Sequence, residues 1–283
     1  MRPFKYLAII ITTCILNSCS DTIVIQAPPG PIDESAQALP VSGQFTKRAL
    51  IEDYTGTWCG NCAKVAYGID LVFAQPQIKA VAVAIHNGND PYHYTPFQPL
   101  KNLISPDHDL ELPQARLNRT ITWTDPDTNS QQVFDLTSAN TGLGLAMSST
   151  VTPTNINLTV KVEFAQNYSD LRIVVLILEN HLTYRQVNYS TYYGGLNIPA
   201  FDHNHVLRAP LTNILGDVLT EPTLSGETIT KNYSVALPLL TPYKNISNPA
   251  NVSFVAFIVD QDNKVLNVRG AEANEIQLLE KNP

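Results

Sequence analysis

The chain carries a Cys-x-x-Cys motif, Cys59-Gly60-Asn61-Cys62, between an apolar run and a helix-like run. Residues 49–54 predict a β-strand before the motif, and residues 63–72 predict an α-helix after it. At such a junction the first sulfur lies at a helix N-terminus, where backbone N–H groups and the helix dipole favour a thiolate. The second sulfur lies one turn further on, where it can resolve a mixed disulfide. The pattern therefore predicts an architecture for dithiol–disulfide chemistry.

The number of cysteines narrows the possible uses of this motif. The chain has four, Cys14, Cys19, Cys59 and Cys62, and the first two belong to a predicted targeting region. A zinc ribbon would need a second pair in the folded part, and a disulfide-framework protein would need more bridges. A redox-active pair and a small structural disulfide both stay open, although closing so short a loop stabilises little.

The amino terminus predicts export and attachment to a membrane. Arg2 and Lys5 precede an apolar segment at 7–16 that is too short to span a bilayer. The segment ends in Leu-Asn-Ser-Cys at 16–19, which resembles a bacterial lipobox. That resemblance implies a signal peptide at 1–18 and lipidation of Cys19, which would hold the protein to the membrane. An ordinary secretory signal is the alternative.

The chain is acidic, with a net charge of −7 that becomes −9 when Arg2 and Lys5 leave with residues 1–18. This charge argues against nucleic acid as a partner. Residues 20–42 are rich in Pro, Ala, Gln and Ser, a composition that buries too little apolar surface to fold. We therefore expect a lipidated flexible tether at 19–42. No later segment is long and apolar enough to predict a transmembrane helix.

The remaining residues predict two domains. Residues 43–150 alternate strand and helix signals, with a nearly all-apolar strand at 80–85 and a helix near 131–147. Residues 151–283 contain short runs of Val, Ile, Thr and Tyr between turn residues, and the run at 156–164 alternates apolar and polar side chains. The predicted fold class is α/β plus all-β, an α/β domain followed by a β-sandwich-like domain.

The decapeptide at 53–62, Asp-Tyr-Thr-Gly-Thr-Trp-Cys-Gly-Asn-Cys, resembles the active-site turn of the thioredoxin superfamily. The resemblance implies a thioredoxin-like domain at 43–150, with Cys59 as the exposed nucleophile and Cys62 as the buried resolving cysteine. It also implies that Asp53 relays a proton to the resolving thiol. Trp58 would flank the turn, and Pro113 would be the cis-proline that lies beside the sulfurs and helps to bind extended peptide. Gly-Asn between the cysteines departs from the common Gly-Pro, which leaves the redox direction open.

A second resemblance covers nearly the whole mature chain. It rests on the order of a lipoprotein signal, the motif at 52–62 and the sequence His-Asn-His-Val-Leu-Arg-Ala at 203–209. This order resembles the outer membrane protein 28-related family of bacterial lipoproteins. The resemblance implies a lipid-anchored outer-membrane protein, periplasmic or surface-exposed, that pairs a thioredoxin-like domain with a β-rich domain.

Several candidate residues also have a purely structural interpretation. Asp53 could be a core carboxylate satisfied by backbone N–H groups, and a buried carboxylate needs either a partner or a raised pKa. Tyr92 could select substrate beside the motif or pack over the long segment that contains it. His203 and His205 would share a face of a strand, but no third ligand adjoins them, which favours a hydrogen-bonded pair over a metal site. We expect neither a metal nor a cofactor.

Two functions fit these features. The first is thiol–disulfide exchange on extracytoplasmic protein thiols and disulfides, with Cys59, Cys62 and Asp53 as catalytic residues and Trp58, Pro113 and Tyr92 binding substrate. The second is a surface-displayed binding or adhesion module that holds a partner protein, in which the disulfide is permanent. Accessibility of Cys59 discriminates the two, because an exposed sulfur of low pKa favours exchange and a buried bridge favours a scaffold.

Overall fold

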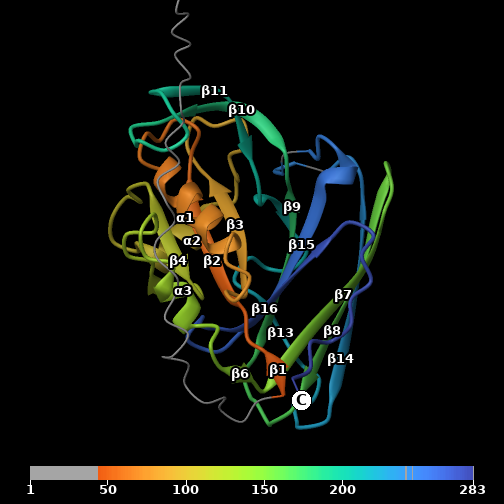
Figure 1. Ribbon diagram of the computed structural model, residues 1–283. Helices are drawn as coiled ribbons and strands as arrows, with labels where there is room; N and C mark the ends of the chain where they lie inside the picture. The colour runs from red at the N-terminus through yellow and green to blue at the C-terminus, as the bar shows by residue number, and fades with distance from the viewer. Residues whose placement is uncertain (1–43, 240, 244, 283) are drawn as a thin grey trace, which may run out of the picture.

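The computed structural model describes residues 44–239, 241–243 and 245–282 (Figure 1). The predicted signal peptide, the lipidation site Cys19 and the whole of the predicted tether lie outside these residues. Within the described ranges, no helix reaches the length and apolarity that crossing a membrane requires.

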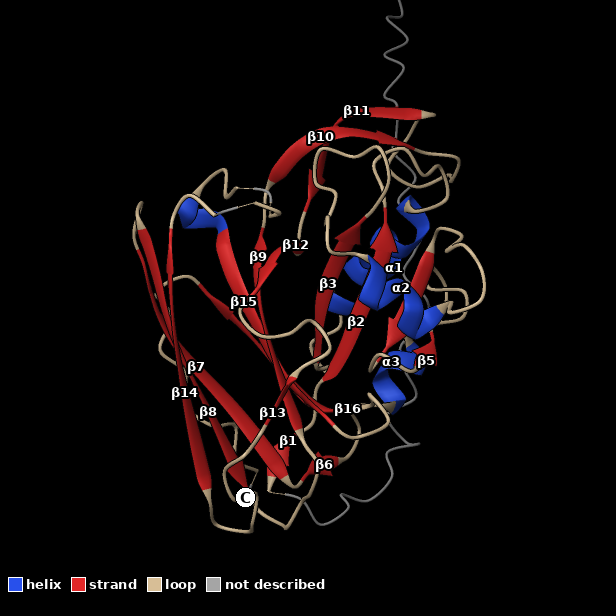
Figure 2. Ribbon diagram, turned by 180° about the vertical axis from the view of Figure 1, so that it is seen from behind, coloured by secondary structure: helices blue, strands red, loops and turns tan. Residues whose placement is uncertain are grey.

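Strands make up 41% of the described residues and helices 11% (Figure 2). The helices are α1 (Ala63–Phe73), α2 (Gln98–Ile104), α3 (Gln131–Asp135) and the 3-10 helix η2 (Pro249–Asn251). The strands are β1 (Phe45–Thr46), β2 (Ala49–Thr55), β3 (Ala80–His86), β4 (Gln114–Leu117), β5 (Ile121–Thr122), β6 (Asn140–Thr141), β7 (Leu143–Val151), β8 (Asn155–Phe164), β9 (Arg172–Glu179), β10 (Leu182–Val187), β11 (Asn197–His203), β12 (Val206–Pro210), β13 (Asp217–Val218), β14 (Thr228–Ala236), β15 (Val252–Val259) and β16 (Val265–Glu272).

A nine-stranded sheet runs through the molecule in the order β16-β15-β9-β12-β3-β2-β4-β5, with β13 paired to β9. β3 runs parallel to both β2 and β12, and the other pairs of the sheet are antiparallel. The parallel pair β2–β3 is joined through α1, the crossover that such a pair requires. The nearly all-apolar strand predicted at 80–85 is β3, and most of its residues are buried.

The predicted fold class, an α/β thioredoxin-like domain followed by a β-sandwich-like domain, is wrong. The chain is mostly β, and strands from both sides of residue 150 share the nine-stranded sheet. The predicted helix near 131–147 contributes to the error, because α3 ends at Asp135 and residues 143–151 form β7. β7 pairs along its whole length with β8, and this tertiary pairing overrides the local helix signal.

A second sheet, in the order β14-β8-β7, packs on one face of the large sheet (Figures 1 and 2). β8 alternates as predicted, with Ile156, Leu158, Val160 and Val162 buried. Facing residues of β9 and β15 complete this core, and their odd and even positions point to opposite sides of the sheet. Ile173, Val175 and Ile177 contact the second sheet, whereas Val174, Leu176 and Leu178 join a core on the other side.

The other half of the large sheet carries the helices. Helices α1 and α3 cover one face of β2, β3 and β4, where Ile51, Val65 and Phe134 share a core. The opposite face of β2 and β3 contacts α2 through Tyr54, Val83 and Leu100. Each strand at the centre of the sheet is therefore covered on both faces, which agrees with its nearly continuous apolar sequence.

The two ends of the described chain lie together, where Asn282 donates its backbone N–H to the Gln44 carbonyl at 2.7 Å and β1 pairs with β6. The β10–β11 hairpin forms the opposite end of the molecule (Figures 1 and 2). Any tether that precedes residue 44 therefore enters the fold far from this hairpin.

Buried charges cross-link the large sheet. Arg119 is almost fully buried; its Nε lies 3.3 Å from Glu52 Oε1, and its Nη2 donates to the Ile214 carbonyl at 2.9 Å. Its guanidinium also stacks over the ring of Phe257, 4.8 Å from the centroid. One side chain thus connects β2, β15 and the loop after β12.

Arg119→Met is expected to lower the free energy of unfolding by about 3–5 kcal/mol, because it leaves the Glu52 carboxyl buried without its cation. Urea unfolding followed by circular dichroism measures the change. The control is Arg185→Met at an exposed position, which should change stability by less than about 0.5 kcal/mol. Equal effects of the two substitutions would contradict the assignment of a stabilising role to the buried pair.

Candidate functional site

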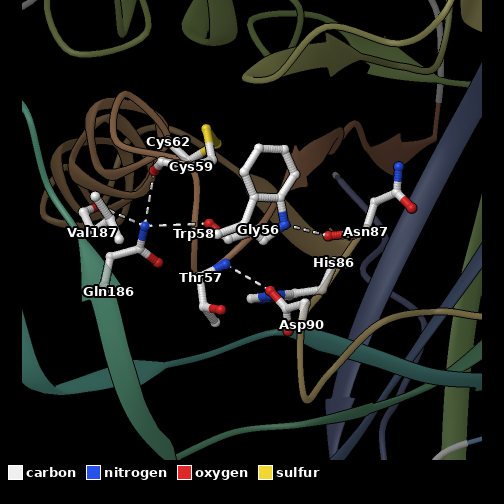
Figure 3. Close-up of a disulfide and its surroundings, with 10 residues drawn as sticks. All are labelled: Gly56, Thr57, Trp58, Cys59, Cys62, His86, Asn87, Asp90, Gln186 and Val187. Atoms are coloured by element: carbon white, nitrogen blue, oxygen red, sulfur yellow. Dashed lines mark hydrogen bonds and ion pairs between the residues drawn. A yellow bond between two sulfur atoms is a disulfide. The ribbon is translucent and has the colours of Figure 1, made fainter.

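Cys59 and Cys62 form a disulfide, with the sulfur atoms 2.04 Å apart, in the turn between β2 and α1 (Figure 3). Cys62 is the N-cap of α1, so the helix begins after the second cysteine rather than at the first. Cys59 is 5% exposed and Cys62 is 2% exposed. The exposed nucleophile that the thioredoxin resemblance implied at Cys59 is therefore wrong for this disulfide-bonded state.

The β10–β11 hairpin covers this turn. The Gln186 Nε2 amide lies 3.0 Å from the Cys59 carbonyl and 3.3 Å from the Gly56 carbonyl (Figure 3). The backbone N–H of Val187 donates to the Thr57 carbonyl at 2.9 Å, and that of Tyr189 donates to the Gly60 carbonyl at 2.7 Å. No sequence pattern singled out Gln186, because its partners lie more than a hundred residues away along the chain.

Gly60 leaves space for the exposed ring of Tyr189. A Cβ atom built at Gly60 would lie 2.2 Å from the ring of Tyr189, closer than two carbon atoms can approach. The glycine of the Cys-Gly-Asn-Cys sequence therefore serves the fit between the turn and the hairpin.

Asp90 holds the other side of the turn. Its Oδ2 accepts from the Thr57 N–H at 2.6 Å and lies 2.9 Å from His86 Nδ1, while its Oδ1 accepts from the Tyr92 N–H (Figure 3). Burial opposes ionisation, but the His86 and backbone hydrogen bonds outweigh it and lower the pKa of Asp90. The sequence analysis missed this residue, although it follows the predicted strand at 80–85 directly in a polar loop.

The three predicted substrate-binding residues, Trp58, Pro113 and Tyr92, make different contacts. Trp58 is 45% exposed, and its indole N–H donates to the Asn87 carbonyl at 2.8 Å. The Leu112–Pro113 peptide bond is cis, and Pro113 directly precedes β4, whose first residue pairs with Tyr54 of β2. The Tyr92 ring packs against His86 and His203, with centroids 5.4 Å away in each case. Their roles in binding substrate stay predictions.

Asp53 lies inside the fold, on β2. It is 3% exposed, and its Oδ1 has no hydrogen-bond partner within the described part of the chain. The structural interpretation of Asp53 expected backbone N–H groups to bind its carboxylate, and Oδ1 has no such partner among the described residues. Burial raises the pKa of Asp53 to about 8, so the carboxyl is mostly protonated at neutral pH.

Asp53 and Cys62 line the same cavity, whose volume is about 430 Å³. β2, β3 and α1 form its inner wall, and β11 with the residues that follow it forms the outer wall. The protonated Asp53 carboxyl and the Cys62 half of the disulfide therefore border the same cavity. It does not include Cys59 among its lining residues.

His203 and His205 also line this cavity, but they do not share a strand as the sequence predicted. His203 ends β11, and His205 follows in a left-handed backbone conformation (φ 59°) before β12 begins. Burial lowers the pKa of each to about 4, so both are neutral at pH 7. The described residues contain no cluster of three or more His, Cys, Asp or Glu suited to a metal ion.

Asp53→Asn is expected to flatten the dependence of stability on pH. Because the folded pKa is raised above the unfolded value of about 4, the unfolded chain releases this proton first, and stability falls as pH rises toward 8. Wild type and variant share the same histidines and Lys47, whose titrations cancel in the comparison, so the difference between the two slopes from about pH 5 to 7 comes from Asp53. We expect wild type to lose on the order of 1 kcal/mol per pH unit relative to the variant.

Urea unfolding at matched pH values measures these slopes. Asp107→Asn, at an exposed carboxyl, is the matched control and should leave the slope unchanged. Parallel pH profiles for wild type and Asp53→Asn would mean that Asp53 is ionised in the folded protein.

The fold and the site define a mostly β protein in which a hairpin covers a disulfide turn at the start of a helix. Residues 110–277 match the family described as outer membrane protein Omp28. The match covers more than half of the chain, and the chain belongs to this family. It is accordingly a protein of the outer membrane. No curated protein matches the chain.

Solved structures provide further likenesses. HBP35 of Porphyromonas gingivalis superposes with a TM-score of 0.60 at 15% identity, over 83% of this chain and 78% of that one. A domain of the outer membrane lipoprotein Omp28 from the same organism has 20% identity and a TM-score of 0.32, over 48% of this chain and 92% of that one. A protein from Agrobacterium tumefaciens has 14% identity and a TM-score of 0.45, over 84% and 99%. The likeness to HBP35 shows a similar overall fold.

Proposed function

We propose that the protein is an outer-membrane binding module that holds a partner protein against the β10–β11 hairpin and the disulfide turn beneath it. The observation that carries the proposal is that the hairpin bonded to the backbone of the disulfide turn carries exposed aromatic side chains, Tyr184 and Tyr189, while Cys59 itself is buried. In this function the disulfide is permanent and shapes the turn on which the hairpin rests.

The loop from Tyr189 to Asn197 has the composition of a protein-binding loop. Its sequence, Tyr-Ser-Thr-Tyr-Tyr-Gly-Gly-Leu-Asn, combines the residue types that dominate antibody paratopes. Tyr189 is 67% exposed and Leu196 is 70% exposed, and Trp58 on the underlying turn is also exposed. Aromatic side chains of this kind supply a large contact area at a small cost in conformational entropy.

The loop is ordered from within, which reduces the cost of binding. The Asn188 amide donates to the carbonyls of Tyr192 and Gly195, and the Tyr192 hydroxyl donates to Asp127 at 2.9 Å. The rings of Tyr67 and Tyr192 stack with centroids 3.8 Å apart. A preorganised loop loses less freedom when a partner binds than a loose one does.

The position of the hairpin supports the same proposal. It lies at the end of the molecule opposite to Gln44, where the described chain begins (Figure 1). If Cys19 carries the predicted lipid, the hairpin faces away from the attachment point. The partner is then an extracytoplasmic protein rather than the membrane itself.

A photo-reactive residue placed at Leu196 of the full-length protein is expected to give one discrete adduct in intact cells. The same residue at Thr230, exposed on β14, should give none. Tyr189→Ala should reduce the adduct at Leu196 several-fold, as loss of an aromatic anchor does, whereas Val218→Ala, at an exposed apolar position on β13, should not. Equal labelling from both positions, or no effect of Tyr189→Ala, would count against this binding face.

Thiol–disulfide exchange is a second candidate function, favoured by the cavity that joins Asp53 to Cys62. In the reduced protein, the Cys59 thiolate would attack a substrate disulfide and expel one substrate thiolate. The Cys62 thiol would give its proton to the carboxylate form of Asp53, which is the minor form at neutral pH, and then attack the mixed disulfide and expel the second. The hairpin would have to move for a protein substrate to reach Cys59.

The reduction potential of the disulfide separates the two functions, measured by equilibrating the full-length protein with glutathione and trapping free thiols. We expect the bridge to stay closed below about −300 mV, because the contacts of the hairpin hold the turn in its bridged form. A value between about −120 and −270 mV, with exchange activity that Cys59→Ser abolishes, would instead establish exchange.

A further inference from the structure

The cavity behind Cys62 has the size and the lining of a ligand site. Its volume of about 430 Å³ falls within the range of small-molecule sites. Small apolar side chains of α1 and β11, such as Ala66, Ile69 and Ile198, form much of its wall. The lining also includes Asp53, Asp70 and Asp202, and it contains no lysine or arginine.

Two buried polar atoms in the cavity wall have no partner in the described structure, Asp53 Oδ1 and His203 Nε2. Leaving such a group unpaired costs free energy that a bound ligand can recover. By contrast, Asp70 accepts a hydrogen bond from the Tyr193 hydroxyl, and His86 is paired with Asp90. Asp53 is therefore the buried acidic group of the cavity wall that has a carboxyl oxygen without a partner among the described residues.

We propose that this cavity binds a small organic ammonium ion with an apolar body, its charged head against the Asp53 carboxylate. The acidic lining, without a lysine or arginine, disfavours an anion. Phe201 and Tyr193, packed edge to face with ring centroids 5.1 Å apart, also line the cavity, and aromatic rings attract a cation. The apolar wall accommodates the remainder of the ligand.

Binding of a cation should release a proton from the site. Asp53 is mostly protonated at neutral pH, and a neighbouring positive charge favours its carboxylate form. The other titratable groups that line the cavity are Asp70 from α1, His86 from β3, Tyr193 from the loop of the hairpin, Asp202 and His203 from β11, and His205 from the turn that follows. His203 and His205 are already neutral at pH 7, so they neither repel the ammonium ion nor supply this proton.

Titration calorimetry on the full-length, oxidised protein at pH 7 tests the proposal with three ligands of one size. These are phenethylamine, 2-phenylethanol and phenylacetate, which carry a positive, a neutral and a negative head. We expect phenethylamine to bind at least about tenfold more tightly than the alcohol, and phenylacetate not to bind. Titrations in two buffers of different ionisation enthalpy should show close to one proton released per amine bound.

Two variants locate the site. Asp53→Asn should bring the amine to the affinity of the alcohol and abolish the proton release, and Ala66→Phe should fill the cavity and remove binding of both. Val218→Ala, on a remote strand, is the control and should bind as wild type does. Equal affinities for amine and alcohol in wild type, tight amine binding by Asp53→Asn, or unchanged binding by Ala66→Phe would each overturn the proposal. None of these measurements depends on the partner protein or on thiol exchange.

Discussion

The arrangement of the site depends on the pairing of β12 with β3. This contact is short: Val206 pairs in parallel with Ala84, and the Ala84 N–H donates to the His205 carbonyl at 2.8 Å. It joins the strands of the C-terminal half to the strand that follows α1. Because β12 directly follows β11, the same contact fixes the β10–β11 hairpin above the disulfide turn. Together with the hydrogen bonds from the hairpin to the turn, it positions the outer wall of the cavity.

The local features of the site could be predicted from the sequence, but their assembly could not. Hydrophobic periodicity located β3 and β8, the motif located α1, and the resemblance to the Omp28-related family agrees with the family match. The predicted fold class was wrong because a Cys-x-x-Cys sequence carries information on one turn only. It does not indicate which other strands join the sheet that contains β2. The roles of Gln186 and Asp90 were not predicted, because their partners on the turn are distant in sequence. Hydrophobic periodicity carries no information on such pairs.

Asp53 and Asp90 show how hydrogen bonding decides the charge of a buried carboxyl. Both are nearly inaccessible to solvent: Asp53 lines the cavity, and Asp90 binds the backbone of the turn. Asp90 accepts hydrogen bonds from two backbone N–H groups and contacts His86, so its carboxylate form is stabilised. Asp53 has no such partners, and burial alone governs it. The first residue fixes the conformation of the turn, and the second keeps a proton available within the cavity.

The β10–β11 hairpin is a thin element whose two sides face different surroundings. Its outer side chains are exposed around Tyr189 and Leu196, and β11 supplies Ile198 and His203 to the cavity wall. A molecule in the cavity and a protein on the outer surface would therefore contact the two sides of the same ribbon. If occupancy of one side shifts the hairpin, thermodynamic reciprocity requires that each bound molecule change the affinity for the other by the same factor. If both proposals hold, a small molecule in the cavity would regulate the attachment of a protein at the outer membrane.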